Sequence, residues 1–371
     1  MELSAEDSLR LNVLLAQNLH AVRIDESNLI VYALSDKGEA KVQLNPNCKD
    51  EKYIKMVKEL FSTHVLGSPG GYPIYLRRWT RMGQQRADNL EKLLLLGEPE
   101  AVVAVVYAAG ITDEVARRAW WAMPSSENAR RMLDRQEVVD GEMGPVLSEF
   151  LVEFMPFEEE PLAQMESVRL VLQTPGLIDE ATRESIWKKA NRKNAFYVGF
   201  LASQPDDLPD PVSAHAEYET VHEALAPLVE ADNPFAKQFL RLLSTPGQTY
   251  LSTVEKVLKK PSNQDVVVRL FDTVRDYFES VRQQDEPIRE LAEIERIVGE
   301  TLAKPPEALQ QVLTTVPDQK TRIESMLFLS LIGERLVAPI FALTDAVGSV
   351  MRKKIEPVAT PILEHIGKLV R

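Results

Sequence analysis

The chain has a single cysteine, Cys48, among its 371 residues. One thiol excludes an intramolecular disulfide and any zinc or iron–sulfur site that needs several thiolates from this chain alone. The start Met1-Glu2-Leu3 also lacks the basic and apolar segments of an export signal. We therefore expect a cytoplasmic location.

The sequence also lacks a long uncharged apolar run. Its most apolar region, 326–350, is interrupted by Glu334, Arg335, Pro339 and Asp345. A membrane-spanning helix needs about 20 largely uncharged residues. The region therefore predicts core helices, and no membrane span is expected.

Basic residues are fewer than acidic ones: 43 Lys and Arg stand against 56 Asp and Glu, which gives a formal charge of -13. This balance opposes the approach of a polyanion, so nucleic acid is the less favoured partner and a protein partner is expected. The apolar fraction of 44% is that of an ordinary folded protein. At this length two or three packing units are expected.

Strand patterns are confined to the N-terminal quarter. A helix is predicted over 4–19, with Ser4 and Asp7 as its capping pair, and strands over 21–25, 29–34 and 40–44 form a small antiparallel meander. A further helix is predicted over 53–61, and the glycine-rich run 67–71 ends it.

Helical patterns alternate with turns beyond Ala87. The clearest pair of helices covers 99–109 and 112–123, with Thr112 as the cap of the second. The predicted fold is therefore mainly α, with stacked helical hairpins, repeat-like or irregular, after the small β meander.

Three domains are predicted: a small α+β unit over 1–83, a helical-hairpin domain over 84–204 and a C-terminal helical domain over 213–371. The boundary before the last of these is the acidic segment 204–211, which contains three prolines. The tripeptide Thr-Pro-Gly occurs at 174–176 and 245–247 and hints at a repeat.

Local signals place further helices in the C-terminal half. Ser252 with Glu255 and Thr321 with Glu324 match capping boxes. The tail 352–371 predicts a final helix packed on the core, and the alternative is a partner-binding or dimer helix. Pro357 and Pro361 should limit the regularity of this helix.

The candidate binding site is the densest basic and aromatic cluster, which consists of Arg77, Arg78, Trp79, Arg81 and Arg86. Arginine binds phosphate or carboxylate through two parallel hydrogen bonds, and a tryptophan ring can stack on a base. The preferred interpretation is structural, with internal ion pairs around a core tryptophan. The alternative is a binding site for an acidic partner, a nucleotide or RNA.

No metal or other cofactor is expected. His215, Glu219 and His222 would share one face of a helix, but the second Glu-x-x-His element of a di-iron bundle is missing, so a solvated helix face is the preferred interpretation. The glycine run 67–71 lacks the lysine and hydroxyl residue of a P-loop.

No catalytic residues are identified either. The chain has no Gly-x-Ser-x-Gly elbow, and Cys48 follows Asn45-Pro46-Asn47 with no histidine near it in sequence. Enzymatic activity is therefore the minor alternative.

Three runs carry a family resemblance: GYPIYLRRWTRMGQ at 71–84, ARRAWWAMP at 116–124 and EFLVEFMPFE at 149–158. Together they resemble the DsrS proteins, which are encoded with the reverse-type dissimilatory sulfite reductase of sulfur-oxidising bacteria. The resemblance implies a cytoplasmic accessory protein of sulfur oxidation and supplies no catalytic residues. In that context persulfide transfer through Cys48 is a minor alternative. The leading hypothesis is therefore a non-enzymatic regulatory or accessory protein that binds another macromolecule.

Overall fold

The computed structural model describes residues 2–71 and 90–370. Within these ranges the chain is mainly helical, with one three-stranded antiparallel sheet near the N-terminus, which confirms the predicted fold class. The chain forms two compact units, Met1–Pro156 (unit 1) and Phe157–Arg371 (unit 2). This division falls inside the predicted segment 84–204.

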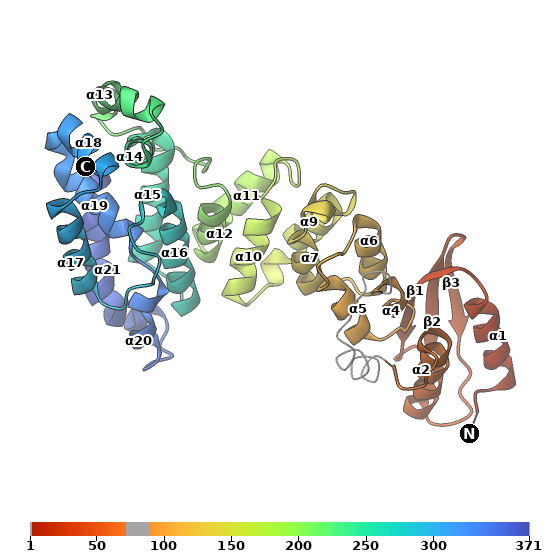
Figure 1. The fold of residues 1–371 in the computed structure, drawn as a ribbon. Coiled ribbons are helices and arrows are strands. Elements are labelled where there is room, and N and C mark those ends of the chain that lie inside the picture. Colours follow the sequence, from red (N-terminus) through yellow and green to blue (C-terminus); the bar gives the residue numbers. More distant parts are fainter. Residues whose placement is uncertain (1, 72–89, 371) are drawn as a thin grey trace. The chain divides into compact units, whose positions relative to one another are not determined.

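The sheet of unit 1 consists of three strands paired in sequence order, β1 (Leu19–Asp25), β2 (Ile30–Ser35) and β3 (Gly38–Gln43). Side chains alternate along β2, where Val31 and Ala33 are fully buried and Ile30, Tyr32 and Leu34 are partly exposed. The buried face packs with α1 (Ala5–Leu15) and α2 (Asp50–Leu66) around Tyr53 and Phe61 (Figure 1).

Two end signals of these helices are confirmed. The Ser4 hydroxyl accepts a hydrogen bond from the Asp7 N–H at 3.2 Å and caps α1. Gly67 ends α2 with a left-handed backbone (φ 68°), a conformation that glycine adopts without steric cost.

The rest of unit 1 is helical, and its predicted helix pair is confirmed. The Thr112 hydroxyl caps the second of these helices by accepting from the Val115 N–H at 3.3 Å. The helices are α4 (Leu90–Leu93), α5 (Pro99–Val106), α6 (Asp113–Ala122), α7 (Ser126–Leu133), α8 (Gln136–Val139) and α9 (Met143–Phe154).

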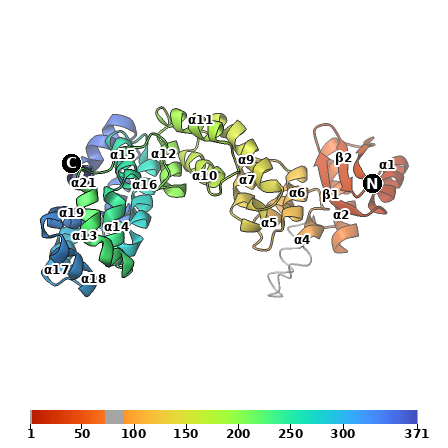
Figure 2. The same ribbon diagram turned by 90° about the horizontal axis from the view of Figure 1, so that it is seen from above.

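Unit 2 is built of helices in its described residues. Helix α10 packs on α12, α15 on α16 and α19 on α21 (Figure 1), while α13, α14 and α18 lie together (Figure 2). The helices are α10 (Pro161–Val171), α11 (Glu180–Ala190), α12 (Ala195–Ser203), α13 (Tyr218–Glu230), α14 (Pro234–Leu243), α15 (Thr245–Lys259), α16 (Gln264–Tyr277), α17 (Leu291–Ala303), α18 (Glu307–Thr315), α19 (Lys320–Ser330), α20 (Ala338–Phe341) and α21 (Gly348–Val370).

The proline-rich segment 204–211, predicted as a domain boundary, lies inside unit 2. Trp187 Nε1 donates to Asp210 Oδ2 at 2.8 Å, and just beyond the segment the Val212 N–H donates to Thr249 Oγ1 at 2.9 Å. These bonds tie the segment to the helices around it. Prolines prevent it from being helical but do not make it a linker.

Both predicted capping boxes of unit 2 are wrong. Ser252 lies in the interior of α15, which starts at Thr245 and is capped by Ser244, and Thr321 lies inside α19. Proline is favoured in the first turn of a helix, so Thr245-Pro246 starts α15 well before Ser252.

The two Thr-Pro-Gly tripeptides are not equivalent. The first lies in the turn after α10, where Gly176 has φ 94°, and the second forms the first turn of α15. The match therefore does not mark a structural repeat.

The tail forms one continuous helix, α21, with Pro357 and Pro361 inside it. Pro357 is exposed, whereas Ile355, Ile362 and Ile366 are buried on the opposite side. The packing of the apolar face thus stabilises the helix by more than the loss of the two backbone N–H donors at Pro357 and Pro361 destabilises it. Among the described helices, none is both long and apolar enough to cross a membrane.

Candidate functional site

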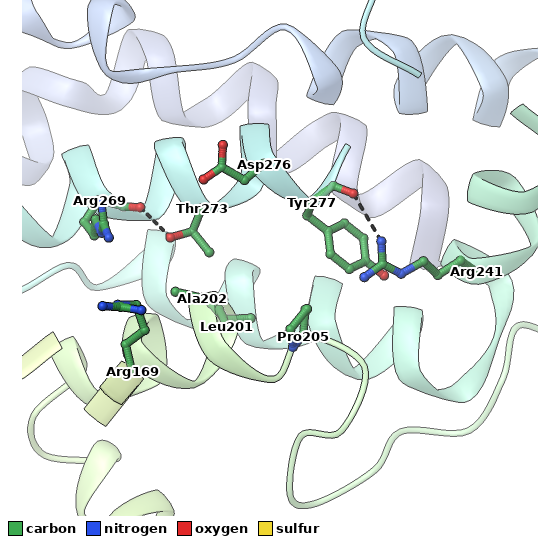
Figure 3. A pocket seen from close by; sticks show the side chains of 9 residues that line it. All are labelled: Arg169, Leu201, Ala202, Pro205, Arg241, Arg269, Thr273, Asp276 and Tyr277. Carbon is green, nitrogen blue, oxygen red and sulfur yellow. Dashed lines mark hydrogen bonds between the residues drawn. The ribbon is translucent and has the colours of Figure 1, made fainter. Parts of the chain in front are cut away.

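Unit 2 contains a pocket of about 390 Å³ between α10, α12, α14 and α16 (Figure 3). Leu201 and Ala202 of α12, with Pro205 just beyond, form an apolar side of it. The other lining residues are polar or aromatic, and three of them are arginines. A cavity of this size accommodates a small molecule or a side chain of a partner.

The three arginines come from three different helices. Arg169 and Arg241 each lie in the last turn of a helix, α10 and α14, where the helix dipole stabilises a positive charge. Arg269 lies in the middle of α16. Figure 3 shows the side chains of Arg169 and Arg269 close to each other at one end of the pocket and that of Arg241 at the other.

Arg241 is held by several contacts. Its Nε and Nη2 donate to the two carboxylate oxygens of Asp206 at 2.8 and 2.7 Å, and its Nη1 donates to the Tyr277 carbonyl at 3.3 Å. The guanidinium carbon lies 3.8 Å from the centroid of the Tyr277 ring. This arginine is therefore fixed in position before any ligand arrives.

Tyr277 forms the wall behind Arg241. Its ring stacks on Tyr250 at a centroid distance of 3.7 Å, so both of its faces are covered. Burial raises the pKa of Tyr277, although Arg241 opposes the shift. The hydroxyl thus stays protonated at neutral pH and does not act as a base.

Arg169 is also paired. Its Nε and Nη2 donate to Glu166 at 2.9 and 2.6 Å, and the Ser203 hydroxyl donates to its carbonyl at 2.9 Å. The bond from Ser203 links α10 to the end of α12 next to the pocket. Because the Glu166 carboxylate accepts two hydrogen bonds from the guanidinium group of Arg169, it also fixes the plane of that group.

Arg269 differs from the other two arginines. Its side chain is exposed, and no carboxylate of residues 2–71 or 90–370 lies within 4.0 Å of its guanidinium. Asp272, one turn away, is partly buried and accepts a hydrogen bond from the Glu334 N–H at 3.3 Å. Arg269 therefore offers its donors to the pocket.

The remaining polar groups of the pocket are on α16. The Thr273 hydroxyl donates to the Arg269 carbonyl at 2.7 Å (Figure 3). The hydroxyl proton of Thr273 is therefore already used in a hydrogen bond within the helix. Asp276 is exposed. The pocket thus presents hydrogen-bond donors and charges, and its lining as described contains no nucleophile paired with a base.

The predicted binding cluster of Arg77, Arg78, Trp79, Arg81 and Arg86 lies outside the described residues. Its role in binding an acidic partner, a nucleotide or RNA stays a prediction.

The histidine trio does not share a helix face. His215 precedes α13 and is buried, with its Nδ1 accepting from the Glu217 N–H at 3.2 Å, whereas Glu219 and His222 lie on α13. The assumption of a common helix was therefore wrong. Across the ranges that the structure describes, no group of three His, Cys, Asp or Glu residues is arranged to hold a metal ion.

Cys48 lies at the edge of the unit 1 core and is partly exposed. Its thiol is 3.7 Å from the Lys49 carbonyl, a weak hydrogen bond. The role of Cys48 in persulfide transfer stays a prediction.

Sequence reasoning did not identify the pocket arginines. Arg169 and Arg241 precede the two Thr-Pro-Gly tripeptides by five and four residues, each at the end of a leucine-rich helix. The shared sequence marks two helix ends that approach one pocket. In the sequence the tripeptide gives only a hint of a repeat, and nothing in it shows that the two helix ends meet.

Comparisons of the chain with family models, with curated proteins and with solved structures find no match.

Proposed function

We propose that this protein is a non-enzymatic accessory or regulatory protein and that the pocket of unit 2 is its binding site for an anionic group, a phosphate or a carboxylate. The accessory role in sulfur oxidation belongs to the proposal through the family resemblance alone. A macromolecular partner, expected from the sequence, would present such a group from one of its side chains or as a bound ligand.

The observation that carries the proposal is the placement of Arg169 and Arg269 at one end of the pocket (Figure 3). Two guanidinium groups repel each other, and an anion between them would convert the repulsion into attraction. The chain has 13 more acidic than basic residues, so a carboxylate partner for Arg269 would have been easy to supply.

Charge balance sets the expected strength of binding. Glu166 and Asp206 pair with Arg169 and Arg241, so among the three arginines of the pocket Arg269 is the one without an ion pair in the described part of the chain. The binding of a single anion should therefore be modest and should weaken with salt, because the site is open to solvent.

The test is a calorimetric titration of the full chain with ethyl phosphate and with hexanoate, at low and at high ionic strength. Arg269→Ala should weaken the binding of both by about tenfold, the size of a lost hydrogen bond to a charged group. The control is Arg296→Ala, which removes an exposed arginine of α17 that pairs with Glu300 at 2.8 Å. Equal binding by wild type and Arg269→Ala would contradict the proposal.

A further inference from the structure

An acidic residue lies in the same pocket as the three arginines. Asp276 is on α16, seven positions after Arg269, and both residues line the pocket. Positions i and i+7 lie on one helix face, separated along the axis by about 10 Å. The face that presents Arg269 therefore also presents a carboxylate.

Asp276 forms no ion pair with a basic side chain of the described residues. It is exposed, and in the described part of the chain no Lys, Arg or His nitrogen lies within 4.0 Å of its carboxylate. Arg241, the other arginine on that side, is occupied by Asp206. Arg269 and Asp276 are thus opposite charges on one face that do not form an ion pair with each other.

A carboxylate in this position is unfavourable for a simple anion. It repels the ligand that the arginines attract, and it gains nothing in return from a phosphate or carboxylate alone. It becomes favourable when the ligand has an ammonium group that reaches it. The arrangement of charges then discriminates between ligands that have this group and ligands that lack it.

We infer that the ligand is a small zwitterion, with its anionic group between Arg169 and Arg269 and its ammonium group at Asp276. The inference rests on the proposed function of the pocket. The part of the ligand that joins the two charges would pack on the apolar side formed by Leu201, Ala202 and Pro205.

The experiment compares two matched pairs of ligands that differ by the amine, O-phosphoethanolamine with ethyl phosphate and 6-aminohexanoate with hexanoate. The phosphate pair and the carboxylate pair distinguish the two sources of negative charge. Wild type should bind the amine-bearing member of at least one pair about two- to fivefold more tightly, as expected for one exposed ion pair.

Asp276→Asn should abolish this preference and should leave the binding of ethyl phosphate and hexanoate equal or slightly stronger. Asp318→Asn, which changes an exposed carboxylate of unit 2 outside the pocket, should keep the preference. The substituted positions are exposed, and circular dichroism of each variant checks that it is folded.

Two results would overturn the inference, and they are distinguishable. Equal affinity for the members of both pairs, with binding that Arg269→Ala still weakens, would refute the zwitterion and leave the anion site intact. No binding of any of the four compounds would refute both the zwitterion and the proposed function.

Discussion

The guanidinium carbon of Arg241 lies 3.8 Å from the centre of the Tyr277 ring. Together with the hydrogen bonds to Asp206, this contact joins α14 to α16 and to the proline-rich segment that follows α12. The same side chain therefore supports the pocket and holds the segment in place.

Arg241→Ala should destabilise unit 2 by about 1 to 2 kcal/mol, because it removes the stacking contact and the paired hydrogen bonds. Asp206 is half exposed, so solvent screens part of the ion pair and a larger loss is not expected. Arg241→Lys should recover little, since lysine cannot form the planar double contact.

Urea denaturation followed by the far-ultraviolet signal would measure this change. Arg296→Ala, at an exposed pair on α17, should change the stability by no more than about 0.5 kcal/mol. Equal effects of the two alanine variants would show that the contacts of Arg241 contribute nothing beyond a surface ion pair.

A second prediction concerns the buried carboxylate of unit 1. Asp7 is fully buried, and its Oδ2 accepts from the Tyr53 hydroxyl at 2.5 Å and from the Asn45 N–H at 2.7 Å. Burial and then Asp7 raise the pKa of Tyr53, so the phenol stays a donor. Tyr53→Phe should cost about 1.5 to 3 kcal/mol, because a buried carboxylate loses a partner.

Hydrogen exchange of the α1 and α2 amides would report this loss within unit 1. Tyr107→Phe is the matched control: its hydroxyl donates to Glu127 at 3.0 Å, but the side chain is 42% exposed. Its effect should stay within about 0.5 kcal/mol. Unchanged exchange in Tyr53→Phe would mean that the bond to Asp7 does not stabilise the unit.

A third prediction compares two helical glycines. A Cβ atom at Gly247 would lie 2.0 Å from the Arg241 carbonyl oxygen and 2.6 Å from the Leu242 Cα, both backbone atoms, whereas a Cβ at Gly299 would meet nothing within 4 Å. Gly247→Ala should cost about 2 to 4 kcal/mol, because α14 and α15 must move apart.

Gly299→Ala should instead stabilise the protein by about 0.5 to 1 kcal/mol, since alanine has the higher helix propensity. Melting temperatures of the two variants should shift in opposite directions. A shift in the same direction for both would contradict the close approach of the two helices at Gly247.

The fold could be predicted from local signals, and the pocket could not. The hydroxyl groups of Ser4 and Thr112 each accept a hydrogen bond from the backbone N–H three residues later, so the sequence around them is enough to place a helix start. Ser252 has the same local pattern, but the packing of α14 against α15 and the cap at Ser244 include it in a longer helix. Local motifs are reliable where no tertiary contact competes with them.

The pocket depends on which helices pack together. Arg169, Arg241 and Arg269 lie on α10, α14 and α16, and nothing within a single helix indicates that the three approach one another. A dense cluster in the sequence, such as 77–86, is easy to recognise, whereas a cluster formed by packing requires the tertiary contacts. For the same reason, Asp276 cannot be assigned to a site from the sequence alone.

The last prediction concerns pH. His365 of α21 stacks on Phe328 of α19 with ring centroids 3.9 Å apart, and its Nδ1 lies 3.0 Å from Ser325 Oγ. Burial, and to a lesser degree Lys368, lowers the pKa of His365 to about 4. The α19–α21 contact therefore requires the neutral imidazole.

In the unfolded chain this histidine titrates near its ordinary pKa of about 6.5, so between this value and about 4 the unfolded state binds the extra proton. The contribution of His365 to stability is therefore constant above pH 6.5, falls as the pH drops through this window and levels off below it. The full shift would correspond to about 1.4 kcal/mol for each pH unit, but His365 is only partly buried and solvent screens its charge, so the loss by pH 5 should be about 1 kcal/mol.

Melting temperatures near pH 7.5 and pH 5 would test this effect in three proteins. His365→Phe keeps an aromatic ring on Phe328 and cannot be protonated, so its melting temperature should fall less between the two pH values than that of wild type. His222→Gln, at an exposed position of α13, should behave as wild type. A fall in His365→Phe as large as in wild type would mean that other groups, and not His365, cause the loss of stability in acid.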